Sequence, residues 1–198
     1  MSKNRLEAFS DGVLAIIITI MVLELRTPPG AQFASLRPLL PVFSSYVLSF
    51  LYIGIYWNNH HHLLHTIQRV SAGILWANLH LLFWLSLFPF ATAWMGGTNV
   101  APAPTALYGV ILLLAAIAYY ILQSAILATE GRTSVLAAAL GRDWKGKLSP
   151  VIYLTAVPLA FVRPWIANGL YASVALLWLV PDRRIERALR THEHEKSR

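Results

Sequence analysis

Six long apolar runs, separated by short polar turns, constrain this chain more than any other feature of its sequence. A helix needs about 20 mostly apolar residues to cross the hydrocarbon core of a bilayer. Only 13% of the 198 residues are charged and 57% are hydrophobic, whereas soluble domains average about 25% and about 45–50%. The sequence therefore predicts an all-α integral membrane protein with six transmembrane helices, over residues 6–25, 38–57, 70–94, 105–128, 149–162 and 166–180.

Helix-breaking residues mark the boundaries between these runs. A Pro-Pro-Gly turn at 28–30 follows the first run, and an uncharged loop rich in Gly and Pro at 96–104 follows the third. A charged loop at 130–147, with a short helical piece expected at 135–140, separates the fourth run from the fifth. The last two runs are short and joined at Arg163-Pro164, so we expect a hairpin of short spans. We expect one transmembrane domain over residues 1–198, ending in a charged cytoplasmic tail at 182–198.

The basic residues predict the orientation, because Lys and Arg concentrate in short cytoplasmic loops. With a cytoplasmic N-terminus, 13 of the 16 basic residues lie inside, and only Arg26, Arg37 and Arg163 lie outside. We therefore expect a multi-pass protein of the cell (plasma) membrane with both termini in the cytoplasm. This distribution accounts for the net charge of +7, so we expect no nucleic-acid partner. Acidic residues within the first run and the lack of a cleavage pattern after it argue against a signal peptide.

The first run opens on a polar cluster, Arg5, Ser10 and Asp11, that a simple membrane anchor does not need. A carboxylate at the edge of a bilayer is costly unless it is paired or hydrated. Two interpretations stay open from the residues alone. Ser10 and Asp11 either cap the helix N-terminus or join a buried network with a neighbouring span. The nearest candidate partners follow the second run, at Trp57, Asn58, His60 and His61.

A stripe of four residues is the second unusual feature of the first run. At about 100° per residue, Gly12, Ile16, Thr19 and Leu23 share one narrow face of the helix, and Asp11 lies far round from it. The stripe is either a packing seam, in which the threonine bonds to the carbonyl four residues earlier, or the wall of a pore. In a pore, rings of Ile16 and Leu23 form apolar constrictions, and a ring of Thr19 hydroxyls coordinates a passing ion.

Several other functions lack the residues that they need. The chain has no cysteine, so disulfides and thiolate metal sites are excluded. His60, His61, His62 and His65 have no second set of ligands nearby, so we expect no metal site; their titration near neutrality leaves a pH-coupled role open. Enzyme motifs, a carbonyl filter and carboxylates in the middle of a span are also missing. We expect no catalytic residue and no cofactor.

The chain resembles the transmembrane protein 175 family of potassium channels in two motifs. These are Arg5-x-x-x-Phe9-Ser10-Asp11-Gly12, opening the first run, and Trp57-x-x-His60-His61, after the second. The resemblance covers essentially the whole chain in the number and order of spans, and it is to the prokaryotic branch with a single repeat. It implies a homotetramer of six-span subunits in the lipid bilayer, with four first helices around a central pore and potassium as the permeant monovalent cation.

The resemblance also implies roles for single residues. The pore-lining positions lie seven, ten and fourteen residues after the Phe, at Ile16, Thr19 and Leu23, with permeant potassium near Thr19. Hydrophobic constrictions and a hydroxyl layer, without a carbonyl filter, pass potassium over sodium in this family. Ile16 stands where related prokaryotic members often have Leu, and its β-branched side chain is stiffer. The implied network between the first two helices consists of Arg5, Phe9, Ser10, Asp11, Trp57, His60 and His61.

The leading hypothesis is therefore a potassium-preferring channel with a hydrophobic gate. The alternatives are a proton-permeable channel or a pH-coupled secondary transporter that uses the histidine cluster, and a membrane scaffold that transports nothing.

Overall fold

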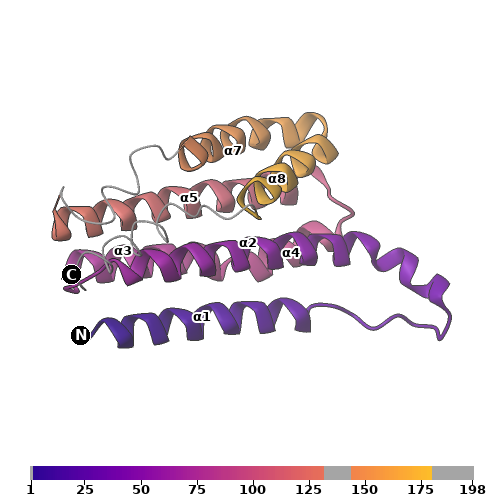
Figure 1. The fold of residues 1–198 in the computed structure, drawn as a ribbon. Helices are drawn as coiled ribbons and strands as arrows, with labels where there is room; N and C mark the ends of the chain where they lie inside the picture. The colour runs from indigo at the N-terminus through magenta and orange to yellow at the C-terminus, as the bar shows by residue number, and fades with distance from the viewer. Residues whose placement is uncertain (1, 132–143, 180–198) are drawn as a thin grey trace.

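The computed structural model describes residues 2–131 and 144–179, and within these ranges the chain is helical, with no strand. The helices lie side by side along one axis and form a bundle (Figure 1). They are α1 (Lys3–Leu23), the 3-10 helix η1 (Phe33–Leu39), α2 (Leu40–His65), α3 (Ala72–Ser86), α4 (Phe88–Gly97), α5 (Pro102–Glu130), α7 (Trp144–Val162) and α8 (Pro164–Leu179). The helical piece expected at 135–140 and the charged tail at 182–198 lie outside the described residues.

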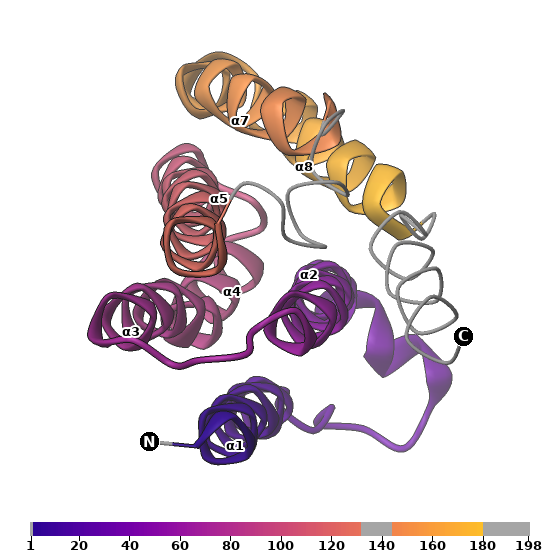
Figure 2. The ribbon, with the colours of Figure 1, turned by 60° about the vertical axis from the view of Figure 1, so that its left-hand side comes forward.

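The first helix lies at one side of the bundle. It packs mainly against α2, α3 and α4, and Figure 2 shows α7 on the opposite side of the molecule. Helix α5 lies between α3 and α7, and α7 pairs with α8. One face of α1 is therefore held by the subunit, and the other faces outward.

Four segments are long and apolar enough to cross a membrane, judged by length and composition. They are Lys3–Leu23, Phe33–His65, Ala72–Gly97 and Pro102–Glu130. The remaining two helices are shorter. Helix α7 has 19 residues, contains Pro150 and Pro158, and begins five residues before the predicted start of the fifth run; α8 has 16 residues and is apolar. The two form the expected hairpin at Arg163-Pro164.

The third predicted run is divided into two helices, α3 and α4, whereas the sequence pattern predicted one span with a proline near its end. Pro89 has no N–H group to donate to the carbonyl one turn earlier. The Leu87 N–H bonds instead to the Trp84 carbonyl, three residues back, at 3.3 Å. The division leaves α4 free to take its own direction against α2.

Buried hydroxyl groups link the helices in the core. Ser49 of α2 lies 2.6 Å from the Thr92 hydroxyl of α4 and 3.0 Å from the Tyr108 hydroxyl of α5. About one turn further along α2, Tyr52 donates to the Tyr171 carbonyl of α8 at 2.6 Å, and Tyr153 of α7 donates to the Tyr52 hydroxyl at 3.1 Å. In a bilayer these groups have little water to bond to, so the bonds favour this one arrangement of helices.

Helices α2 and α4 approach closely at a glycine. A methyl group built on Gly96 would lie 2.7 Å from the Val42 Cα, which is backbone and cannot rotate away. Next to it, Gly97 has open space at the same position. Alanine substitutions at Gly96 and at Gly97 therefore distinguish the effect of close helix packing on stability from the effect of helix propensity.

We expect Gly96→Ala to lower stability by about 1–3 kcal/mol, because the added methyl group overpacks the contact between α2 and α4. The matched change Gly97→Ala is expected to be neutral or stabilising by about 0.5–1 kcal/mol, as for glycine inside a helix. The thermal midpoints of the two purified variants in detergent provide the measurement. Equal midpoints would contradict the close approach at Gly96.

Candidate ion pathway and interhelical network

Helix α1 has a buried face and an exposed face. The buried side chains, which pack on the rest of the subunit, are Leu6, Ser10, Leu14, Ile17 and Met21. The predicted stripe lies on the exposed face: Ile16 is 59% exposed and Leu23 is 76% exposed, and Gly12 and Thr19 are also exposed. Phe9 continues the stripe toward the N-terminus and is half-exposed. The stripe is therefore not a packing seam within the subunit.

Two small residues of the stripe leave room on this face. A methyl group built on Gly12 would meet no atom within 4 Å, so no contact within the subunit requires glycine there. The Thr19 hydroxyl donates to the Ala15 carbonyl at 2.9 Å, as expected for a threonine in an apolar helix. Because the hydroxyl uses only its hydrogen in this bond, its oxygen keeps lone pairs that can accept a hydrogen bond or face a cation.

The buried face of α1 is joined to α2 and α3 by a chain of hydrogen bonds. The Asn78 amide of α3 donates to the Ser10 hydroxyl at 3.0 Å, and the Ser10 hydroxyl donates to the Leu6 carbonyl at 2.9 Å. His60 Nε2 lies 2.7 Å from the Asn78 amide oxygen. Because an amide oxygen only accepts, this bond places a proton on His60 Nε2. All three side chains are buried.

A second link between α1 and α2 lies closer to the surface. Trp57 Nε1 donates to the Asp11 carboxylate at 3.0 Å, and the His61 ring stacks against the Trp57 ring with centroids 6.3 Å apart. Helix α1 begins at Lys3, so Ser10 lies two turns inside it. The alternative that Ser10 and Asp11 cap the N-terminus is therefore wrong.

The structure differs from the predicted network at three residues. Phe9 is half-exposed on the outward face of α1 and makes none of these contacts among the described residues. The Arg5 side chain is exposed and has no hydrogen bond or ion pair with any residue in the described ranges. Asn78, which joins Ser10 to His60, was not among the residues that the sequence analysis selected. The sequence does contain a signal for Asn78, because an asparagine inside an otherwise almost wholly apolar run is costly unless it is hydrogen-bonded.

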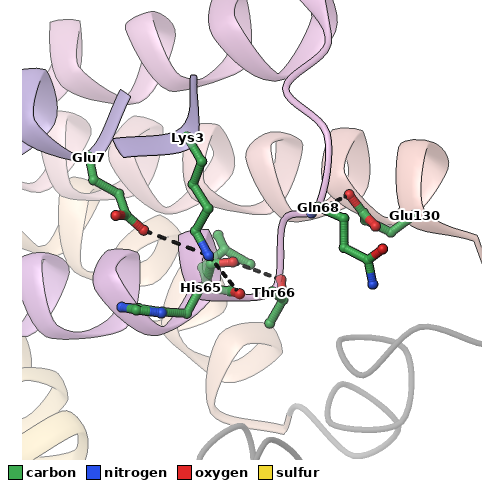
Figure 3. A network of polar contacts seen from close by, with 7 residues as sticks. Lys3, Glu7, His65, Thr66, Gln68 and Glu130 are labelled. Carbon is green, nitrogen blue, oxygen red and sulfur yellow. Dashed lines mark hydrogen bonds and ion pairs between the residues drawn. The ribbon is translucent and has the colours of Figure 1, made fainter. Parts of the chain in front are cut away.

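A separate polar cluster ties the chain together at the end where α1 begins (Figure 3). The Lys3 ammonium donates to the His65 carbonyl at 2.9 Å and lies 4.0 Å from the Glu7 carboxylate. At the end of α5, the Glu130 carboxylate accepts the backbone N–H groups of Gln68 and Arg69, at 2.8 and 3.2 Å. The turn between α2 and α3 is thus held by α5, and the end of α2 by α1.

The histidines form an aromatic cluster. The His61 and His65 rings lie 4.4 Å apart, edge to face, and His62 lies 5.7 Å from His61. In the part of the chain that the structure describes, no group of three or more His, Cys, Asp or Glu side chains has a geometry that could hold a metal ion.

We expect Asn78→Leu to lower stability by about 1–2 kcal/mol, because it leaves the buried His60 ring without its partner. The matched control is Asn58→Leu, since Asn58 is exposed on α2 and the same substitution there removes no buried bond. Thermal midpoints in detergent would compare the two. A loss of the same size in both variants would show that the bond to His60 contributes nothing.

Comparison with known proteins agrees with this architecture. Residues 5–89 match the family model described as the endosomal/lysosomal potassium channel TMEM175. A protein of Chryseobacterium sp. strain P1-3, named as a potassium channel, is 55% identical over 190 residues, which cover 96% of this chain and 99% of the relative. Another, from Streptomyces collinus, is 31% identical and covers 89% of this chain and 91% of that protein.

A solved structure is similar along most of the chain. It is described as a lysosomal potassium-selective channel TMEM175 homologue from Chamaesiphon minutus. The TM-score is 0.78 at 28% identity, and the match covers 91% of this chain and 97% of that one. The family consists of ion channels and not of enzymes. By its sequence and its fold, the chain belongs to the TMEM175 family of potassium channels.

Proposed function

We propose that this protein is a potassium-permeable channel whose ion pathway lies on the axis of a homotetramer and is lined by α1. The observation that carries the proposal is the exposed stripe of α1 on a helix whose opposite face is buried in the subunit. A lipid-facing helix needs neither a glycine nor a hydroxyl there. Membership of the family and the names of the relatives support potassium as the permeant ion.

Four copies of α1 around an axis would turn the stripe into rings. With a rise of about 1.5 Å per residue, the ring of Thr19 would lie about 4.5 Å from the ring of Ile16 and about 6 Å from that of Leu23. Apolar rings can gate a pore by losing water, and a ring of hydroxyl oxygens can replace part of the hydration shell of a cation. We infer that Ile16 and Leu23 form the constrictions and that Thr19 contacts potassium between them, with Gly12 widening the entrance.

The network residues would set the rotation of α1 about its own axis. Ser10 is tied to α3, and through Asn78 to His60 of α2, while Asp11 is tied to Trp57. These bonds hold one face of α1 against the subunit, so the opposite face must point away from it. Arg5 has no partner among the described residues of its own subunit, so its role in this network would require a contact with another subunit.

The proposed subunit is one domain of residues 1–198 with six spans, in which α3 and α4 together make the third and the short helices α7 and α8 the last two. The positive-inside count supports both termini in the cytoplasm, and a multi-pass protein of the cell membrane is the simplest placement. The ends of α1 and α2 that carry the network would then lie on the cytoplasmic side.

We expect Thr19→Ala to reduce the preference for potassium over sodium, because it removes the only hydroxyl of the stripe. The measurement is the reversal potential of purified protein in liposomes under mixed potassium and sodium. Thr155→Ala is the matched control, since Thr155 is an exposed threonine of α7 and is expected to leave the reversal potential unchanged. An unchanged preference in Thr19→Ala would remove Thr19 from the ion pathway.

The same recordings discriminate the alternative functions. A channel gives single-channel currents, whereas a pH-coupled transporter gives slow, saturable flux that is lost on replacing His60 and His61. Buried His60 bonds to Asn78, which fits a structural role better than the repeated protonation that transport would require. Currents that persist with both histidines replaced would exclude the transporter.

We expect Leu23→Cys to form disulfide-linked subunits under mild oxidation, because four copies of this exposed residue would converge on the axis. The natural chain has no cysteine, so the introduced thiol reacts only with its own copies. Phe161→Cys, equally a large exposed residue but on α7, is expected to stay uncrosslinked. Gel electrophoresis without reductant shows the outcome, and crosslinking at Phe161 alone would contradict an axis lined by α1.

A further inference from the structure

A second feature of the subunit lies away from α1. A cavity of about 220 Å³ is enclosed by α2, α5, α7 and α8. Its walls are mostly apolar and aromatic, with Tyr52 and Tyr56 from α2, Tyr153 from α7 and Trp178 from α8 among them. Helix α1 contributes nothing to the lining, so the cavity is no part of the proposed ion pathway.

Two polar groups on the cavity wall have no partner within the described residues. Gln123 of α5 is only 7% exposed and lines the cavity, and no hydrogen bond joins its amide to another described residue. The Tyr56 hydroxyl, on the facing wall, also makes none. The neighbouring buried hydroxyls of Tyr52 and Tyr153 are both bonded. The two groups thus suit a ligand that carries hydrogen-bonding oxygens into the cavity.

The cavity opens to the outside of the subunit near the start of α7. Its lining extends from buried Gln123 to Tyr120, which is 69% exposed, and to Ser124 and Lys147, which are also exposed. Helix α7 has 19 residues and α5 has 29, and Figure 1 shows that α7 begins part-way along α5. The last turns of α5 therefore extend past α7 and leave the opening uncovered by that helix.

Among the residues that the structure describes, the rim of this opening carries one exposed basic side chain. Lys147 lines it directly. Two residues earlier on α7, buried Lys145 does not line the cavity; its ammonium donates to the Leu177 carbonyl at 3.1 Å and lies 6.0 Å from the centre of the Trp178 ring. None of the described residues that line the cavity is acidic. A positively charged rim above an aromatic cavity matches an amphiphile with an anionic head and an apolar tail.

We propose that this cavity binds one anionic phospholipid per subunit, with the phosphate at Lys147, ester oxygens at Gln123 and Tyr56, and an acyl chain among the aromatic side chains. Basic pockets between membrane helices on the cytoplasmic side are suited to anionic head groups. Assigning the lipid to the cytoplasmic leaflet rests on the orientation given under the proposed function. Lipid binding in the cavity does not depend on ion conduction. A negative result for lipid binding would therefore leave the proposed channel function standing, and the reverse also holds.

Native mass spectrometry of the purified full-length protein tests the proposal. The probes are phosphatidylglycerol and phosphatidylcholine with identical acyl chains, added at equal concentration. The wild-type protein is expected to retain about one phosphatidylglycerol per subunit and less phosphatidylcholine. Lys147→Gln is expected to reduce this preference about fivefold, the effect of one basic residue at an anionic surface. Its control, Arg163→Gln, removes an exposed charge at the other end of α7 and is expected to change nothing.

A second pair of variants tests the cavity itself. Ala116 lines it, whereas Ala128 lies on the exposed face of the same helix and does not. Ala116→Phe is expected to abolish most phosphatidylglycerol retention, and Ala128→Phe to preserve it. If Ala116→Phe does not fold, the two charge variants decide the question alone. Equal retention of both lipids by the wild type, no retention of either, or equal behaviour within each pair of variants would overturn the proposal.

Discussion

The rest of this structure depends on how a polar group is satisfied inside an apolar helix bundle. Ser10 lies on the buried face of α1, and its hydroxyl bonds back to its own helix and forward to Asn78 of α3. In a bilayer, breaking such a bond exposes polar atoms to hydrocarbon, so the helix is held at one rotation. Asn78 in turn fixes the His60 ring. The exposed stripe faces outward because the other side of the same helix is held in this way.

The same principle extends through the core. Hydroxyl groups of Ser49, Thr92 and Tyr108 join α2, α4 and α5, and Tyr52 joins α2 to the hairpin of α7 and α8. Apolar contacts between membrane helices discriminate weakly among arrangements, since lipid tails are as apolar as leucine. Specific bonds and close approaches, such as the one at Gly96, therefore contribute much of the specificity. The bundle combines an apolar exterior with a core that contains the buried side chains of Tyr52, Tyr108, Tyr153 and Tyr171.

The subunit has two sides with different characters. The α1 side presents a narrow stripe containing a glycine and a threonine, suited to repetition around an axis. The opposite side presents a cavity with aromatic walls, an unpartnered glutamine and a lysine at its rim. Because α2 contacts α1 and also lines the cavity, an occupant of the cavity would touch the helix that positions the proposed pore.

The sequence by itself determined the features that depend on local patterns. Run length and composition placed the chain in a membrane, helix breakers located most of the helix ends, and helical periodicity put Gly12, Ile16, Thr19 and Leu23 on one stripe. Within the described residues, the sequence missed the start of α7, the division at Leu87 and the continuation of α2 to His65, eight residues past the predicted end at 57. Prolines and polar residues shift or end a helix in ways that depend on the surrounding contacts.

Only the tertiary structure decided which face of α1 is buried, since periodicity alone describes a packing seam and a pore wall equally well. It also decided that Ser10 bonds to Asn78, 68 residues away, and that Gln123 lies in a cavity without a partner. Such pairings join residues far apart in the chain, and a pattern read along one helix carries no information about which side chain of another helix lies opposite.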